Sequence, residues 1–232
     1  MMQNDAFEKY NTWGHSTALR LLYRQRCRRE EPEMTCAAQA ADIIADLARP
    51  GYSLLDVGCG SGYFYHSLQD RNIPVSYCGI DATPSLIEIG QQEMPKYGLL
   101  AENLKAMKLQ DLNSSADLVL SMNFLTYLDN FHAPLERLLD IAKVGVILRE
   151  SISDKACFAY VVDDHLDPGF TLSVHINTYR QTDITDFMIS RGFEVREFMD
   201  RRTKGQPEVF LEQPHYWKFL IATRAQSASR EL

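Results

Sequence analysis

The stretch that most constrains the fold is residues 54–64, which read LLDVGCGSGYF. The apolar run over 53–58 predicts a short buried strand, and Gly58, Gly60 and Gly62 follow at a spacing of two. Glycine adopts backbone conformations closed to other residues and lets a ligand approach the main chain. The first N–H groups of a helix also lack partners within the helix. The stretch therefore predicts a strand, a ligand-binding bend and a helix in succession.

Strands and helices alternate along most of the chain, which indicates the α/β class. The alternation predicts a parallel sheet with right-handed crossovers. We expect further strands at 75–81, 104–109, 116–122, 144–151, 193–200 and 215–224, and helices at 63–71, 85–94, 133–142 and 182–192. Residues 1–50 read as a helical N-terminal segment. No repeat or linker interrupts the pattern, so we predict a single domain over 1–232.

Composition limits the classes of partner and the cellular compartment that we expect for this chain. A net charge of −7 in 232 residues argues against a nucleic-acid partner, because phosphate binding needs clustered positive charge. The five cysteines are scattered and form no C-x-x-C pair, so we expect neither a metal site nor a disulfide framework. The chain shows no signal-peptide pattern and no apolar run of membrane-spanning length. We expect a cytoplasmic protein with no membrane partner.

Two side chains around the bend distinguish between nucleoside cofactors. A dinucleotide fingerprint G-x-G-x-x-G requires glycine or alanine at position 63, where this chain has Tyr63. Asp56 would repel a pyrophosphate but attract an ammonium or sulfonium group. S-Adenosylmethionine carries both cations and no phosphate, so it is favoured over a nicotinamide cofactor. Asp81, at the end of the next strand, can accept hydrogen bonds from ribose hydroxyls of either cofactor.

With these features the chain resembles the class I S-adenosylmethionine-dependent methyltransferases that act on small molecules. The matching pieces are LLDVGCGSG, YCGID, LQDL and ADLVLSMNFLTYL, and the resemblance extends over about residues 40–224. It implies a three-layer α-β-α sandwich with a seven-stranded, mostly parallel sheet whose last strand, here 215–224, is antiparallel. The residues that it assigns to the cofactor are Asp56, Gly58 and Gly60 for the methionine part, Asp81 and Ala82 for the ribose, Asp111 and Leu112 for the adenine, and Met122 near the methionine amine.

The resemblance also suggests that Tyr10 and Trp13 fold over the cofactor, although simple packing is the more frequent role of such aromatic residues. Amino-methylating relatives carry a D/N-P-P-Y/F turn, which residues 121–124 lack. We therefore expect O-methylation of a hydroxyl or carboxyl group on a small molecule. A non-catalytic, partner-binding protein with the same fold is the alternative. We expect a monomer or homodimer.

Candidate catalytic residues lie after the fifth strand, where residues 151–180 are expected to cover the substrate. If 173–181 is extended, His175, Asn177 and Tyr179 project from one face and could position a polar substrate. A solvent-facing edge strand is the competing interpretation. Arg149 and Glu150 end the strand at 144–151, where open α/β sheets bind ligands, and they complete the candidate set.

Overall fold

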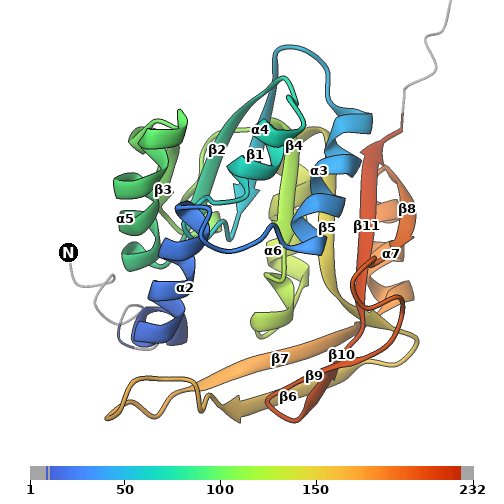
Figure 1. The fold of residues 1–232 in the computed structure, drawn as a ribbon. Helices are drawn as coiled ribbons and strands as arrows, with labels where there is room; N and C mark the ends of the chain where they lie inside the picture. The colour runs from blue at the N-terminus through green and yellow to red at the C-terminus, as the bar shows by residue number, and fades with distance from the viewer. Residues whose placement is uncertain (1–8, 10, 226–232) are drawn as a thin grey trace, which may run out of the picture.

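The structure, a computed structural model, describes residues 9 and 11–225. Its centre is a sheet with the strand order β3-β2-β1-β4-β5-β11-β8 (Figure 1). The strands are β1 (Tyr52–Val57), β2 (Val75–Asp81), β3 (Leu104–Ala106), β4 (Ala116–Met122), β5 (Ala142–Ser153), β8 (Phe193–Met199) and β11 (Trp217–Arg224).

The direction of the strands confirms the predicted fold class. β3, β2, β1, β4 and β5 pair in parallel, whereas β11 is antiparallel to both β5 and β8. The last strand starts later than the predicted residue 215, because the backbone N–H of Tyr216 donates to Ser151 Oγ at 2.9 Å instead of to a strand. His215 belongs to a separate hairpin of β9 (Glu208–Phe210) and β10 (Gln213–His215).

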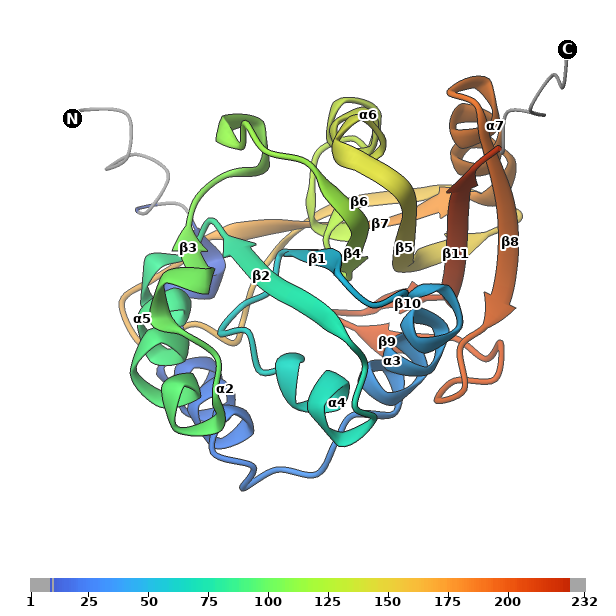
Figure 2. The ribbon, with the colours of Figure 1, turned by 90° about the horizontal axis from the view of Figure 1, so that it is seen from above.

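Helices cover both faces of the sheet and complete three layers, as Figure 2 shows. One apolar core lies between the sheet and α2, α3, α4 and α5, and the other between the sheet and α6 and α7. The α-helices are α2 (Thr17–Cys27), α3 (Thr35–Leu47), α4 (Tyr65–Asp70), α5 (Pro84–Glu93), α6 (His132–Ile141) and α7 (Gln181–Ser190). Short 3-10 turns are η1 (Thr12–His15), η2 (Met94–Tyr97), η3 (Ala101–Asn103), η4 (Leu109–Asp111) and η5 (Leu125–Tyr127).

Alternating side chains of the central strands enter the two cores. Leu54 of β1 and Leu120 of β4 lie in the first core, and Leu55 and Val119 lie in the second. This explains why apolar residues occur at neighbouring positions in β1 and β4, since parallel strands covered on both faces lack a polar side.

Residues after β5 form a ribbon of two antiparallel strands, β6 (Cys157–Val162) and β7 (Ser173–Arg180). The ribbon crosses the end of the sheet at which β1 and β4 finish (Figure 1). β7 also pairs with β5 at Ile152 and Ser153, so the alternative of a solvent-facing edge strand is wrong. The extended conformation predicted for this segment is confirmed.

Candidate active site

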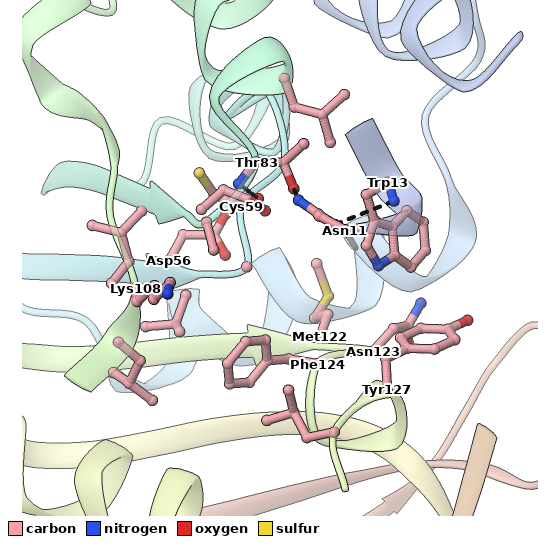
Figure 3. A pocket seen from close by; sticks show the side chains of 18 of the residues that line it. Asn11, Trp13, Asp56, Cys59, Thr83, Lys108, Met122, Asn123, Phe124 and Tyr127 are labelled. Carbon is pink, nitrogen blue, oxygen red and sulfur yellow. Dashed lines mark hydrogen bonds between the residues drawn. The ribbon is translucent and has the colours of Figure 1, made fainter. Parts of the chain in front are cut away.

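A cavity of about 570 Å³ lies at the carboxyl ends of β1, β2 and β4. Its walls come from the glycine bend after β1, the segment after β3, the turn after β4, the N-terminal segment and the β6–β7 ribbon. Figure 3 shows the part of this cavity between Asp56 and Trp13. The carboxyl ends of parallel strands are the usual ligand position of an open α/β sheet, because unpaired backbone groups and loop side chains meet there.

The glycine bend is packed mainly by the protein itself. Gly58, Gly60 and Gly62 have φ angles of 75°, 58° and 73°, which favour glycine. A Cβ on Gly60 would lie 2.1 Å from the Tyr23 ring, and one on Gly62 would lie 2.5 Å from Leu104. Gly58 and Cys59 line the cavity, whereas Gly60 is covered by Tyr23 of α2. Sequence reasoning did not find Tyr23, because its partner lies far along the chain.

Asp81 fixes the bend and the start of α5 at the same time. Its Oδ2 accepts a hydrogen bond from the Gly60 N–H at 2.8 Å, and its Oδ1 accepts one from the Thr83 N–H at 2.8 Å. Burial raises the pKa of this carboxyl group, and the two backbone donors oppose that shift. Asp81 and the adjacent Ala82 both line the cavity. The carboxylate retains lone pairs for further donors, such as hydroxyl groups.

Asp56 is a buried carboxyl group at the cavity wall, with an exposed fraction of 3%. Its Oδ2 accepts a hydrogen bond from the Tyr77 hydroxyl at 2.8 Å. Burial raises the pKa of Asp56 to about 7, and the nearby charge of Asp81 adds to the shift. Among the described residues it has no ion-pair partner. A cationic group in the cavity would therefore stabilise the ionised carboxylate.

The residues after β3 that line the cavity precede the predicted ones in the sequence. Asp111 is exposed and Leu112 is buried in the second core, and neither lines the cavity. The lining residues are instead those at 107–110. The difference arises because the 3-10 turn η4 redirects the chain, so that Leu109 faces the cavity and Asp111 faces solvent.

The N-terminal segment covers the cavity. Trp13 lines it and packs edge to face on Tyr127, with ring centroids 5.1 Å apart. The Asn11 side chain donates to Thr83 Oγ1 at 2.8 Å, and its oxygen accepts from the Trp13 N–H (Figure 3). Tyr10 lies outside the described residues.

A second contact ties this segment to the loop between β6 and β7. Asp167 accepts hydrogen bonds from the backbone N–H and the hydroxyl of Thr17, both at 2.8 Å, and pairs with Arg20 at 3.3 Å. The His15 ring also stacks on Phe170 with a centroid distance of 4.2 Å. The two covers of the cavity are thus joined at its outer side.

The turn after β4 supplies Met122, Asn123 and Phe124 to the cavity. Glu150 holds this turn from below, although it does not line the cavity itself. Its carboxylate accepts from the backbone N–H groups of Phe124, Leu125 and Thr126 at 2.9 to 3.0 Å, and from the Thr126 hydroxyl. Burial raises the pKa of Glu150, and these four donors oppose the shift.

Of the four predicted catalytic residues, only His175 lines the cavity. Its ring lies 4.6 Å from the Tyr160 ring, which lines the cavity as well. Tyr179 is buried and donates to the Leu125 carbonyl at 2.8 Å. Arg149 is buried and pairs with Asp200 at 2.7 Å. Arg149, Glu150 and Tyr179 therefore support the turn after β4 from outside the cavity.

The described residues lack two features that mark other classes of protein. No group of three or more His, Cys, Asp or Glu side chains there is placed to hold a metal ion. Nor does that part of the chain contain a helix with the length and apolar character needed to cross a membrane.

Comparison with known proteins agrees with this geometry. Residues 55–148 match the family model described as a methyltransferase domain. Magnesium protoporphyrin IX methyltransferase from Synechocystis, solved with bound S-adenosylmethionine, is similar over 97% of this chain and 99% of its own, with a TM-score of 0.60 and 17% identity. Residues 55–148 thus match a methyltransferase domain, and the chain has the fold of the S-adenosylmethionine-dependent methyltransferases. The cofactor of this family is S-adenosylmethionine, and the family is one of enzymes.

Two other proteins are similar over a shorter stretch or with a lower TM-score. The malonyl-[acyl-carrier protein] O-methyltransferase of Serratia marcescens is 25% identical over 101 residues, which are 44% of this chain and 38% of that protein. This chain thus matches about two fifths of that curated relative. An amino pentose methyltransferase from Micromonospora echinaspora is 17% identical, with a TM-score of 0.54 over 85% of this chain and 94% of its own.

Proposed function

We propose that this methyltransferase transfers the methyl group of S-adenosylmethionine to an oxygen atom, in a hydroxyl or carboxyl group, of a small molecule. The observation that carries the proposal is that one cavity joins the buried Asp56 carboxyl group to the imidazole of His175. The net charge of −7 also favours a small molecule over a nucleic acid.

The residues around the bend fit the cofactor by their chemistry. Asp56 offers a desolvated carboxylate to a cation, and Asp81 offers acceptors to ribose hydroxyls. Gly58, Ala82, Met122 and Trp13 complete this half of the cavity. When bound, the sulfonium supplies an electron-poor methyl group and a neutral leaving group.

His175 is the proposed general base. A hydroxyl nucleophile must lose its proton during transfer, and an imidazole nitrogen that faces the cavity can accept it. A carboxylate acceptor arrives without a proton and needs only to be placed in line with the methyl group. The roles proposed for Glu150, Arg149 and Tyr179 are therefore positioning roles, exerted through the turn after β4.

Cofactor binding is the first test, measured by isothermal titration calorimetry with S-adenosylmethionine, S-adenosylhomocysteine and NADH. We expect binding of the first two and not of NADH. Asp81→Asn should weaken both by at least about tenfold, because it removes a charge-assisted acceptor. Asp111→Asn, at an exposed position outside the cavity, is the matched control and should bind normally.

Thermal unfolding of each variant separates lost affinity from lost structure, since Asp81 also holds the bend. Undiminished affinity in Asp81→Asn, or preferential binding of NADH, would contradict the proposed site. If the folded chain binds neither sulfonium nor thioether nucleoside, the non-catalytic alternative is favoured.

A further inference from the structure

Asn123 is a cavity residue whose orientation the fold fixes through its backbone and its side chain. Its backbone lies in the left-handed region, with φ of 54°, and its N–H donates to the Arg149 carbonyl at 2.7 Å. The next three backbone N–H groups are held by Glu150. Asparagine tolerates this backbone better than most residues, which fits its presence at the position.

Arg149 determines which side-chain atom of Asn123 faces the cavity. The guanidinium Nη1 donates to Asn123 Oδ1, and Nε donates to Asp200 Oδ2 at 2.7 Å. The guanidinium also stacks on the Trp217 ring at 4.4 Å, and its side chain is 2% exposed. A guanidinium has donors only, so the Asn123 oxygen must turn toward it. The Asn123 NH₂ group is then left to the cavity.

The NH₂ group of Asn123 has no acceptor among the residues that the structure describes, while Asn123 itself lines the cavity. In Figure 3 it lies beside Met122 and Tyr127 and faces Trp13. A ligand that brings an oxygen acceptor to this position would satisfy the amide donor. An ammonium group would instead meet another donor and would leave the amide N–H groups without an acceptor.

The surface outside the cavity is apolar on the ribbon side. Phe158, Tyr160 and Val162 alternate along β6 and are 65%, 66% and 57% exposed. Residues at this spacing share one face of a strand. Tyr160 also lines the cavity, so the apolar row continues directly from the cavity wall. The row is therefore available to a ligand that is longer than the cavity.

We propose that Asn123, held by Arg149, selects the acceptor group, and that the substrate is an apolar molecule with a carboxylate. Its carboxylate accepts from the Asn123 NH₂ group, and its hydrocarbon or aromatic part lies along Phe158, Tyr160 and Val162. This inference rests on the proposed function and specifies its substrate class. Asn123 binds the acceptor, and Arg149 acts through it as a positioning residue.

The test compares three probes with one apolar body: 2-naphthoate, 2-naphthol and (2-naphthylmethyl)ammonium. Each is titrated into the full chain saturated with S-adenosylhomocysteine. We expect 2-naphthoate to bind at least about tenfold more tightly than the ammonium probe, with 2-naphthol between them. Asn123→Asp replaces the donor by an acceptor and should reverse the order of the two charged probes.

Matched variants separate the amide from the apolar row. Asn113→Asp makes the same change at an exposed position and should leave all three affinities unchanged. Asn123→Gly suits the left-handed backbone and removes the donor, so it should abolish the preference even if Asn123→Asp folds poorly. Phe158→Ala and Tyr160→Ala should weaken all three probes by similar factors.

The inference is overturned if the ammonium probe binds as tightly as 2-naphthoate, if Asn123→Gly keeps the preference, or if no probe binds. Failure of the proposed function is a separate result, because it requires that the unmodified chain does not bind the nucleoside in the preceding titration.

Discussion

The cavity has a bend half, around the glycine bend at residues 58–62, and a ribbon half, along β6 and β7. The two halves are built differently. Around the glycine bend, the contacts join neighbouring strand ends and are largely satisfied within the protein, as with Asp81 on the N–H groups of Gly60 and Thr83. Around the ribbon, support comes from distant segments, as with Arg149 on Asp200, while aromatic side chains of β6 remain exposed. One half thus fits a fixed, polar ligand, and the other leaves apolar surface for a variable one.

Removing the charge of the buried Asp200 tests whether the ribbon half depends on the ion pair between Asp200 and Arg149. Asp200→Asn should destabilise the protein by about 3 to 5 kcal/mol, because it leaves the Arg149 cation unpaired in the interior. Denaturant unfolding measures the change. Asp183→Asn, which breaks the exposed pair with Arg180, is the matched control and should change little. Equal losses of stability in the two variants would show that the ribbon half does not depend on the buried pair.

Crowding the bend tests the other half. Gly60→Ala should cost about 2 to 3 kcal/mol and weaken cofactor binding, since the new Cβ would lie 2.1 Å from the Tyr23 ring at a φ of 58°. Gly51→Ala has a similar φ of 89° but open space around it, so it should cost only about 1 kcal/mol. The two costs are measured by urea unfolding.

The Tyr23 contact can be isolated by combining two substitutions. If the ring causes the difference, Tyr23→Ala should recover part of the stability lost in Gly60→Ala. A Gly60→Ala cost that is unaffected by Tyr23→Ala would show that the backbone angle alone is responsible.

The sequence predicted the strand and the glycine bend well because their signals are local, although Gly60, predicted to line the cofactor site, is covered by Tyr23. Strand periodicity, the glycine spacing and Asp81 lie within a short stretch, and the parallel pairing of the strands follows from their alternation with helices. Asp111 was predicted to face the cavity, but a 3-10 turn that leaves no periodic signal turns it outward. The structure instead places 107–110 there.

The ribbon half could not be predicted to the same extent. The period of two correctly put His175, Asn177 and Tyr179 on one face, but it could not show what covers each of them. Asn177 and Tyr179 meet backbone carbonyls of the η5 turn region, and only His175 reaches the cavity. No sequence motif marks Asn123 or Tyr160 as a cavity residue. The position of Asn123 depends on Arg149, and that of Tyr160 depends on the register of the β6–β7 ribbon.

The pH dependence of stability should differ between the halves. A folded pKa of about 7 for Asp56, above the ordinary value of 3.8, means that the folded protein holds this proton more tightly than the unfolded chain. Between about pH 4 and 7 stability should therefore fall as pH rises, by up to about 1.4 kcal/mol per pH unit. Asp56→Asn should reduce this slope in urea unfolding measured across that range.

Cofactor binding gives a second readout of Asp56. A cationic ligand favours the carboxylate, so binding near pH 6 should release a proton that Asp56→Asn does not release. Calorimetry in buffers of different ionisation enthalpy measures the release. Proton uptake on binding would show that Asp56 does not face the cation.

The smallest effect on stability is expected at the junction of the two covers. Asp167→Asn weakens contacts that are partly exposed, so unfolding should change little. The rates at which cofactor and acceptor enter and leave should rise together in stopped-flow fluorescence of Trp13. A change in only one of the two rates would show that the covers move independently.

The single carboxylate of Asp167 also bears on the order of events in a catalytic cycle. It holds the first turn of α2, whose Tyr23 lines the bend half of the cavity, from the loop between β6 and β7 in the ribbon half. Both ligands are consequently expected to enter and leave through the same opening of the cavity. The methylated product and S-adenosylhomocysteine should then be released in the same opening movement. Turnover would then follow the lifetime of the closed state rather than the affinity of either ligand.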